Sequence, residues 1–327
     1  MDREGFRAYL KTRHATDDTI ERSFGLAEAF ERLTKTVVGR PAREATAACA
    51  RSFVAALAGR GEATVDALLA VARYERFLGN RDAYLTLIET LDGHEVMGNL
   101  HQKVADEAGE ALRDEAFSGV EIPEFDVSNL ERARRMRVVA ERLEILLGRN
   151  RAASIFGQGL RDLPNEAYVH ERTLFEEAGG IDEYLRRKGD RFIAELREIR
   201  DQGSLYYTQP VTDEVIAYVE EHPEIRQGVR VGNVLVEAKI PYMAAAYLRE
   251  SNAGRRAYLY CHCPWARESL QHDEKAVPRS FCNCSAAFHR KPYEVIFGRS
   301  LESRVLGTVL AGDPWCRFAI TLPEGVA

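Results

Sequence analysis

Residues 303–323, SRVLGTVLAGDPWCRFAITLP, decide the fold class of this chain. Two apolar runs within them meet at the turn Gly312-Asp313-Pro314. Apolar runs rich in β-branched residues on either side of a turn predict a pair of antiparallel strands. Two segments further upstream have the same strand-like character, residues 204–208 and 232–241. We therefore expect a small antiparallel sheet close to the C-terminus.

The first 200 residues predict helices almost throughout. Apolar side chains recur at helical spacing, and glycine-containing turns separate the segments. The expected helices cover residues 17–33, 42–58, 63–78, 80–92, 94–117, 129–148, 150–161, 166–177 and 181–202. The predicted fold class is therefore α+β and helix-rich, with an all-helical N-terminal region followed by a C-terminal α+β domain that contains a small antiparallel sheet.

The sequence around the cysteines also predicts local structure. Residues 255–263, RRAYLYCHC, alternate in the manner of a strand, and PWARESL (264–270) predicts a short helix that begins at Pro264. A longer helix is expected over 285–298, because SAAFHRKPYEVIF is followed by a glycine.

The segment GVEIPEFDVS (119–128) interrupts the helical pattern with Gly119 and Pro123. It is the best candidate for a domain boundary, and the change from helices to mixed elements after Gly203 marks a second one. The predicted organisation is a helical domain over 1–120, a helical connecting region over 121–203 and a cysteine-rich α+β domain over 204–327, which binds a small molecule or a metal.

The composition limits the kinds of function. At 327 residues the chain is long enough for two domains, and its 45% apolar and 29% charged residues are ordinary values for a globular protein. No stretch approaches the ~20 apolar residues that cross a bilayer, and the N-terminus lacks the apolar core of a signal peptide. We therefore expect a cytoplasmic protein without a membrane partner. The net charge of −6 argues against nucleic-acid binding.

Cysteine usage locates the chemistry. Five of the six cysteines fall within the 56 residues from Cys261 to Cys316, and in a reducing compartment such clustering indicates metal binding or catalysis. Two Cys-x-Cys pairs can supply four thiolates to one tetrahedral centre, which suits Zn²⁺ or, as the alternative, an iron–sulfur cluster. The predicted metal ligands are Cys261, Cys263, Cys282, Cys284, His262 and Cys316.

The same residues also allow thiol catalysis. Cys263 and Cys282 each precede a predicted helix, whose N-terminus lowers a thiol pKa, so both are candidate nucleophiles. His289 and Glu294, on the helix expected over 285–298, are candidate proton-transfer residues. A third interpretation is that the cysteines only pack as small apolar side chains, as we expect for the sixth, Cys49.

A family resemblance supports this location. The run CHCPWARESL…FCNCSAAFHRKPYEVIFG…VLAGDPWCRFAITLP resembles the L-2-amino-thiazoline-4-carboxylic acid hydrolase family and the related 4-vinyl-reductase-type small-molecule-binding domains. The resemblance begins at about Leu205, and its most specific part is the closing Gly-Asp-x-x-Cys-x-Phe pattern. It implies a site for a small ligand, with Cys263, Cys282 and Cys316 as suggested metal ligands. Cys261 and Cys284 depart from the family pattern.

A second resemblance concerns the N-terminus. FRAYLKTRHATDDTIERSFGLAEAFERL (6–33) is similar to the helical core-binding arm of tyrosine recombinases, which contacts DNA. The downstream Arg…His-x-x-Arg…Tyr arrangement of such enzymes is not found in this sequence. Together with the net negative charge, this favours helical packing over DNA binding.

Two functions are therefore expected. The first is a small-molecule- or metal-binding, sensor-like protein, whose helical half passes occupancy of the cysteine site to a partner or to a homodimer. The alternative is a cysteine- or metal-dependent hydrolase of a small cyclic C–N or C–S substrate, in which a metal-activated water or a thiolate attacks an electrophilic carbon.

Overall fold

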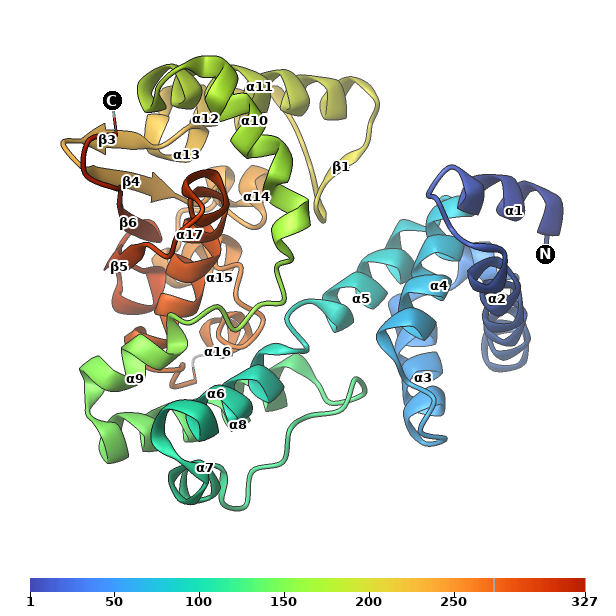
Figure 1. Ribbon diagram of the computed structural model, residues 1–327. Helices are drawn as coiled ribbons and strands as arrows, with labels where there is room; N and C mark the ends of the chain where they lie inside the picture. The colour runs from blue at the N-terminus through green and yellow to red at the C-terminus, as the bar shows by residue number, and fades with distance from the viewer. Residues whose placement is uncertain (273, 327) are drawn as a thin grey trace. The chain divides into compact units, whose positions relative to one another are not determined.

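The computed structural model describes residues 1–272 and 274–326 and shows a helix-rich α+β protein (Figure 1). The chain forms two compact units. Unit 1 comprises residues 1–94 and 123–128, and unit 2 comprises residues 95–122 and 129–327. The predicted fold class is confirmed. Within the described residues, no helix is both long enough and apolar enough to cross a membrane.

Unit 1 is helical. Its elements are α1 (Arg3–Lys11), α2 (Asp17–Val38), the 3-10 turn η1 (Ala42–Glu44), α3 (Ala47–Ala58), α4 (Val65–Phe77) and α5 (Arg81–Leu91). Thr16 caps α2, because its side chain accepts a hydrogen bond from the Thr19 N–H at 3.3 Å. Ile20 and Phe24 lie on the buried face of α2, in one core with Cys49.

Unit 2 contains the remaining helices and both sheets. Its helical elements are α6 (Val96–Ala108), α7 (Glu110–Phe117), α8 (Asn129–Leu147), α9 (Arg149–Phe156), η2 (Asn165–Tyr168), α10 (Val169–Ala178), α11 (Ile181–Asp201), α12 (Asp213–Glu221), α13 (Pro223–Arg226), α14 (Ala244–Arg249), α15 (Ala253–Tyr260), α16 (Arg267–Gln271), η3 (Arg279–Cys282), α17 (Asn283–Phe297) and η4 (Val309–Ala311). A minimal hairpin is formed by β1 (Leu205–Tyr206) and β2 (Gln209–Pro210).

A four-stranded antiparallel sheet positions the cysteine-rich region. In spatial order its strands are β3 (Val229–Val231), β4 (Val234–Ala238), β6 (Arg317–Thr321) and β5 (Glu302–Gly307). The predicted strand pair is confirmed as β5 and β6. Its turn is also present, where Gly312 has a φ of 86° and the Asp313 carboxylate accepts a hydrogen bond from the Thr308 N–H at 2.8 Å. Helix α17 packs on β5 and β6.

Two local predictions are wrong. Residues 253–260 form α15 rather than a strand, because the Asn252 side chain caps a helix there by accepting a hydrogen bond from the Arg255 N–H at 2.9 Å. A short apolar run such as AYLY fits both the period of a helix and the period of a strand, and here the N-terminal cap selects the helix. The helix expected over 94–117 divides into α6 and α7 at Gly109, whose φ of 88° no helix allows.

The division into units differs from the predicted domain boundaries of 1–120, 121–203 and 204–327. The first cut lies at His94, and the two later regions form one unit. The physical reason is a single hydrophobic core that takes side chains from α6 through to β6, among them Val96, Met136, Trp265 and Phe318. The break at 119–128 does coincide with a change of unit, because residues 123–128 belong to unit 1 and the residues on both sides of them belong to unit 2.

Candidate functional site

The five C-terminal cysteines come from different elements of unit 2, and all are free thiols. Cys261 follows α15, Cys263 precedes the turn before α16, Cys282 and Cys284 lie at the start of α17, and Cys316 precedes β6. Cys261 and Cys316 are buried, with 4% and 9% of their surface exposed, and the other three are half-buried.

Thr308, directly after β5, lies between two of these thiols. Its hydroxyl oxygen is 3.3 Å from the Cys282 sulfur and 3.9 Å from the Cys316 sulfur. The same oxygen accepts a hydrogen bond from the Leu310 N–H at 3.2 Å, and Thr308 is fully buried. One hydroxyl therefore holds sulfurs from two separate segments close to one another.

Burial keeps the thiols protonated. It raises the pKa of Cys282 and of Cys284 to about 12, and it raises the pKa of Cys261 well above its ordinary value. Repulsion between neighbouring thiolates adds to this effect, from Cys263, Cys316 and Cys282 on Cys261. These four sulfurs therefore form one electrostatic group. A position at the start of α17 does not give Cys282 the depressed pKa that a resting nucleophile needs.

Two of the sulfurs accept backbone hydrogen bonds. The N–H of Cys263 donates to the Cys261 sulfur, and the N–H of Val309 donates to the Cys316 sulfur. Burial remains the larger influence on both pKa values, but each of these bonds favours the thiolate. Hydrogen bonds to sulfur of this kind surround the thiolate ligands of metal centres.

Lys239, directly after β4, brings a positive charge to the thiols. Its Nζ donates a hydrogen bond to the Ser285 hydroxyl at 3.1 Å and lies 5.9 Å from the ring centres of both Phe288 and Phe318. Its charge favours the thiolate forms of Cys282, Cys284 and Cys316. The same charge favours the neutral forms of His262 and His289.

In the sequence His262 lies between Cys261 and Cys263, and its imidazole is neutral. Its Nε2 lies 2.6 Å from the carbonyl oxygen of Ile240, so this nitrogen carries the proton and Nδ1 carries the lone pair. Burial, followed by the charge of Lys239, lowers the pKa of His262 to about 3. Its unprotonated Nδ1 is the form of imidazole that binds metals or accepts protons.

A buried ionic network holds the second histidine. Glu237, on β4, is 6% exposed. One carboxylate oxygen accepts hydrogen bonds from the Lys188 ammonium and the Tyr293 hydroxyl, each at 2.6 Å, and the other oxygen lies 2.9 Å from His289 Nδ1. Lys188 comes from α11, whereas Tyr293 and His289 come from α17, so the network ties two helices to the sheet.

The network fixes the charge of both partners. Burial opposes ionisation of Glu237, but Lys188 and the hydrogen bond from His289 outweigh it and lower the pKa of the carboxyl to about 2. Burial also lowers the pKa of His289, in spite of the carboxylate beside it. His289 is therefore neutral, donates its Nδ1–H to Glu237 and keeps Nε2 as an unprotonated nitrogen.

Two further predicted features differ in the structure. Cys263 does not adjoin a helix N-terminus, because the chain first turns through residues 264–266, closed by a 2.9 Å hydrogen bond from the Arg267 N–H to the Cys263 carbonyl. Glu294 pairs with Arg290 at 2.8 Å and accepts a hydrogen bond from the Leu301 N–H at 3.1 Å. The carboxylate of Glu294 therefore closes the end of α17.

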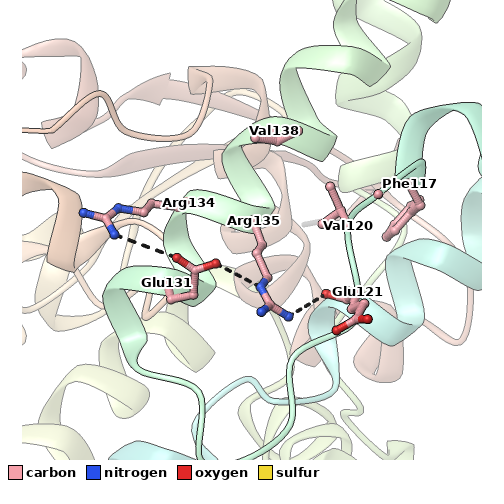
Figure 2. Close-up of a pocket in the computed structure, with 8 residues that line it drawn as sticks. Phe117, Val120, Glu121, Glu131, Arg134, Arg135 and Val138 are labelled. Carbon is pink, nitrogen blue, oxygen red and sulfur yellow. Dashed lines mark hydrogen bonds and ion pairs between the residues drawn. The ribbon is translucent and has the colours of Figure 1, made fainter.

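The described residues of unit 2 line a smaller and a larger cavity. The smaller has a volume of about 130 Å³ and is lined by Cys284 and by residues of α17 and of the 158–163 segment. The larger has a volume of about 490 Å³ and lies between the end of α7 and the start of α8 (Figure 2). No predicted site residue lines the larger cavity, and its guanidinium groups, on Arg134 and Arg135, both pair with Glu131.

Within residues 1–272 and 274–326, no group of three or more His, Cys, Asp or Glu side chains is arranged so that it could hold a metal ion. Comparison of the chain with known protein families, with curated proteins and with solved structures gives no match. The site is therefore interpreted from its own geometry.

Four functional candidates escaped the sequence analysis, namely Lys188, Glu237, Lys239 and Tyr293. Two of them left a signal. Glu237 and Lys239 are charged residues within VLVEAKIP, an otherwise apolar strand, where a charge needs a partner. Lys188 left none, because it lies among many charged residues on a helix.

Proposed function

We propose that unit 2 binds a soft metal ion, with Zn²⁺ as the first candidate, through the thiols of Cys261, Cys263, Cys282 and Cys316, and that it acts as a sensor. The observation that carries the proposal is the Thr308 hydroxyl, which lies 3.3 Å from the Cys282 sulfur and 3.9 Å from the Cys316 sulfur, so that thiols from two segments of the chain meet there. Repulsion among the thiolates of Cys261, Cys263, Cys282 and Cys316 accords with a common location. Soft thiolates select zinc and related ions over the harder Mg²⁺ and Ca²⁺.

The surroundings of the sulfurs support this choice. Backbone N–H groups already donate to Cys261 and Cys316, and Lys239 supplies a positive charge that favours thiolates. Four thiolates around a divalent ion carry a net negative charge, which such donors and cations stabilise. His262 Nδ1 and Cys284 are the additional ligands that remain from the set predicted by the sequence.

Binding changes the site, which is what a sensor requires. The thiols are protonated before binding, so a metal must release their protons. It must also replace the contacts of Cys282 and Cys316 with the Thr308 hydroxyl. We therefore expect the 261–266 and 308–316 segments to rearrange when the ion binds. A partner, or a second copy of the chain, would respond to that change.

Titration of the metal-free protein with Co²⁺, followed by competition with Zn²⁺, tests the proposal. We expect the charge-transfer absorption of a cobalt–thiolate centre at one equivalent, an affinity that rises with pH, and release of Co²⁺ by Zn²⁺. Cys282→Ser and Cys316→Ser should each lose this absorption. Cys49→Ser, in the core of unit 1, is the matched control and should keep it. Absence of any thiolate absorption in the unaltered chain would overturn the proposal.

The resemblance to the 2-amino-thiazoline-4-carboxylic acid hydrolase family supports the same positions, Cys263, Cys282 and Cys316. We also propose a cytoplasmic location, because a reducing compartment keeps all six thiols free, as they are in the structure. Sedimentation of the protein with and without Zn²⁺ tests whether occupancy changes a monomer–dimer equilibrium.

The hydrolase remains a second candidate because of one further observation, the hydrogen bond that orients His289. With Nδ1–H held by Glu237, the free Nε2 has the form of a general base that takes a proton from water as it attacks an electrophilic carbon. Hydrolysis of a small thiazoline carboxylate, lost in His289→Gln and kept in His272→Gln, would support this function. No turnover of cyclic C–N or C–S substrates by folded protein would exclude it.

A further inference from the structure

The small cavity beside Cys284 carries an excess of positive charge. Three of its lining residues are cationic, Arg161, Arg290 and Lys291, and one is anionic, Glu294. Glu294 forms its ion pair with Arg290 at 2.8 Å. The lining residues therefore include more cations than carboxylates, and the one lining carboxylate is paired with Arg290 rather than with Lys291.

One side of this cavity is rigid. Arg290 donates a hydrogen bond to the Gly157 carbonyl at 3.0 Å and another to the Ser303 hydroxyl at 3.2 Å, in addition to its pair with Glu294. These bonds join α17 to the end of α9 and to β5. A wall held in this way does not need to be ordered when a ligand enters, which lowers the entropic cost of binding.

The ammonium of Lys291 supplies the charge that is still available. Within the described part of the chain, Lys291 forms no hydrogen bond and no ion pair, although it lines the cavity and is half-buried. Arg161 also lines the cavity, and its charge favours the thiolate form of Cys284. Glu95 acts on the same thiol in the opposite sense and more weakly.

The size of the cavity restricts the ligand. Its volume of about 130 Å³ corresponds to roughly four water molecules at about 30 Å³ each. That space admits a tetrahedral oxyanion of phosphate or sulfate size. The larger cavity offers a contrast, because Arg134 there is already paired with both oxygens of Glu274 and Arg135 is paired with Glu131.

We propose that this cavity binds a small tetrahedral oxyanion, of phosphate or sulfate size, between Lys291, Arg161 and the rigid Arg290. Cationic side chains around a concave space stabilise such an anion by charge-assisted hydrogen bonds. The site goes beyond the proposed metal function and does not depend on it, because no metal ligand has to be deprotonated for the anion to bind.

Calorimetric titration of the purified full-length protein with inorganic phosphate, and separately with sulfate, tests this inference. We expect one saturable site whose affinity decreases as ionic strength rises. Lys291→Gln should weaken binding about tenfold, equivalent to about 1.4 kcal/mol, and Lys291→Glu should abolish it. Arg299→Gln, an exposed cation just beyond the same helix that does not line the cavity, is the control and should bind as the unaltered protein does.

A second readout locates the anion. The bound ion should protect Cys284 from alkylation by neutral iodoacetamide, measured by peptide mass spectrometry, and Cys49 should show no such protection. Circular dichroism of each variant establishes that it is folded. The inference is overturned if neither anion binds saturably at millimolar concentration, or if folded Lys291→Glu binds as tightly as the unaltered protein. It is also overturned if saturating phosphate leaves the alkylation rate of Cys284 unchanged.

Discussion

Each unit buries a glutamate, and the two carboxyl groups end in opposite states. Glu75, on α4 of unit 1, is 0% exposed, and one of its oxygens accepts a single hydrogen bond from Asn80 at 2.6 Å. Burial, with a contribution from nearby Glu31, raises the pKa of Glu75 to about 8. Glu237 of unit 2 is almost as deeply buried, yet its pKa is lowered to about 2.

The difference lies in what surrounds each carboxyl. Among the described residues no cation pairs with Glu75, so its carboxyl is neutral near pH 7. Its partner Asn80 also donates hydrogen bonds to the carbonyls of Ala42 and Ala45, so the carboxyl is part of a structural network. Glu237 has the Lys188 ammonium, so it stays ionised and orients His289. Burial sets the direction of a pKa shift only when no opposite charge is buried with the group.

Removing the cation from Glu237 should have the largest effect on stability. Lys188→Met leaves a carboxylate buried without its partner, and loss of one member of a buried pair costs about 4 kcal/mol. Both tryptophans, Trp265 and Trp315, lie in unit 2, so urea unfolding followed by tryptophan fluorescence reports on that unit alone.

The double variant Lys188→Met/Glu237→Gln provides the control. Because it removes both charges, it should recover much of the stability that Lys188→Met loses. If Lys188→Met changes the free energy of unfolding of unit 2 by less than about 0.5 kcal/mol, Lys188 is not the group that holds Glu237 ionised.

Glu75 should make unit 1 less stable as pH rises. Below its ordinary pKa of 4.5 the carboxyl is protonated in both the folded and the unfolded chain. Between 4.5 and about 8 only the unfolded chain releases the proton, so the free energy of unfolding falls as pH increases. Glu75→Gln should therefore stabilise unit 1 by about 3 kcal/mol at pH 7 and change it little at pH 4.5.

Hydrogen exchange of the α4 amides at the two pH values measures this effect within unit 1. The exposed Glu44→Gln is the matched control and should show no pH-dependent gain. Equal stabilisation by Glu75→Gln at both pH values would mean that the carboxyl is already ionised in the folded protein, and the contrast with Glu237 would disappear.

The sequence predicted features that depend on local patterns. The strand pair around Gly312-Asp313-Pro314 and the helix that ends before Gly298 were both correct, because turn residues and periodicity act over a few residues. Residues 255–263 were misassigned, because a single capping side chain, Asn252, outweighed the alternation. The predicted break at 119–128 falls where the chain changes unit. The division after His94 and the joining of the two later regions were not predicted, because they follow from a core that joins α6 to β6 across more than half of the chain.

The candidate site likewise has features that the sequence predicted and features that it did not. The clustering of cysteines in sequence included Cys282 and Cys316, whose sulfurs both contact the Thr308 hydroxyl. The Thr308 hydroxyl between Cys282 and Cys316 and the bond from Glu237 to His289 depend on strand register and helix packing, which no short motif encodes. Charge inside an apolar strand was the one available hint of Glu237.

Removal of a neutral donor from Glu237 should give the smallest effect. Tyr293→Phe deletes the hydroxyl that donates to the carboxylate at 2.6 Å, and a hydrogen bond to a charged group is worth about 1.5 kcal/mol. Lys188 and His289 remain, so Glu237 stays ionised and unit 2 stays folded. Tyr184→Phe, whose hydroxyl donates at 2.9 Å to the more exposed Glu171, is the matched comparison and should cost less in the same fluorescence-detected urea unfolding. A greater loss for Tyr184→Phe would show that the Glu237 network is held by Lys188 alone.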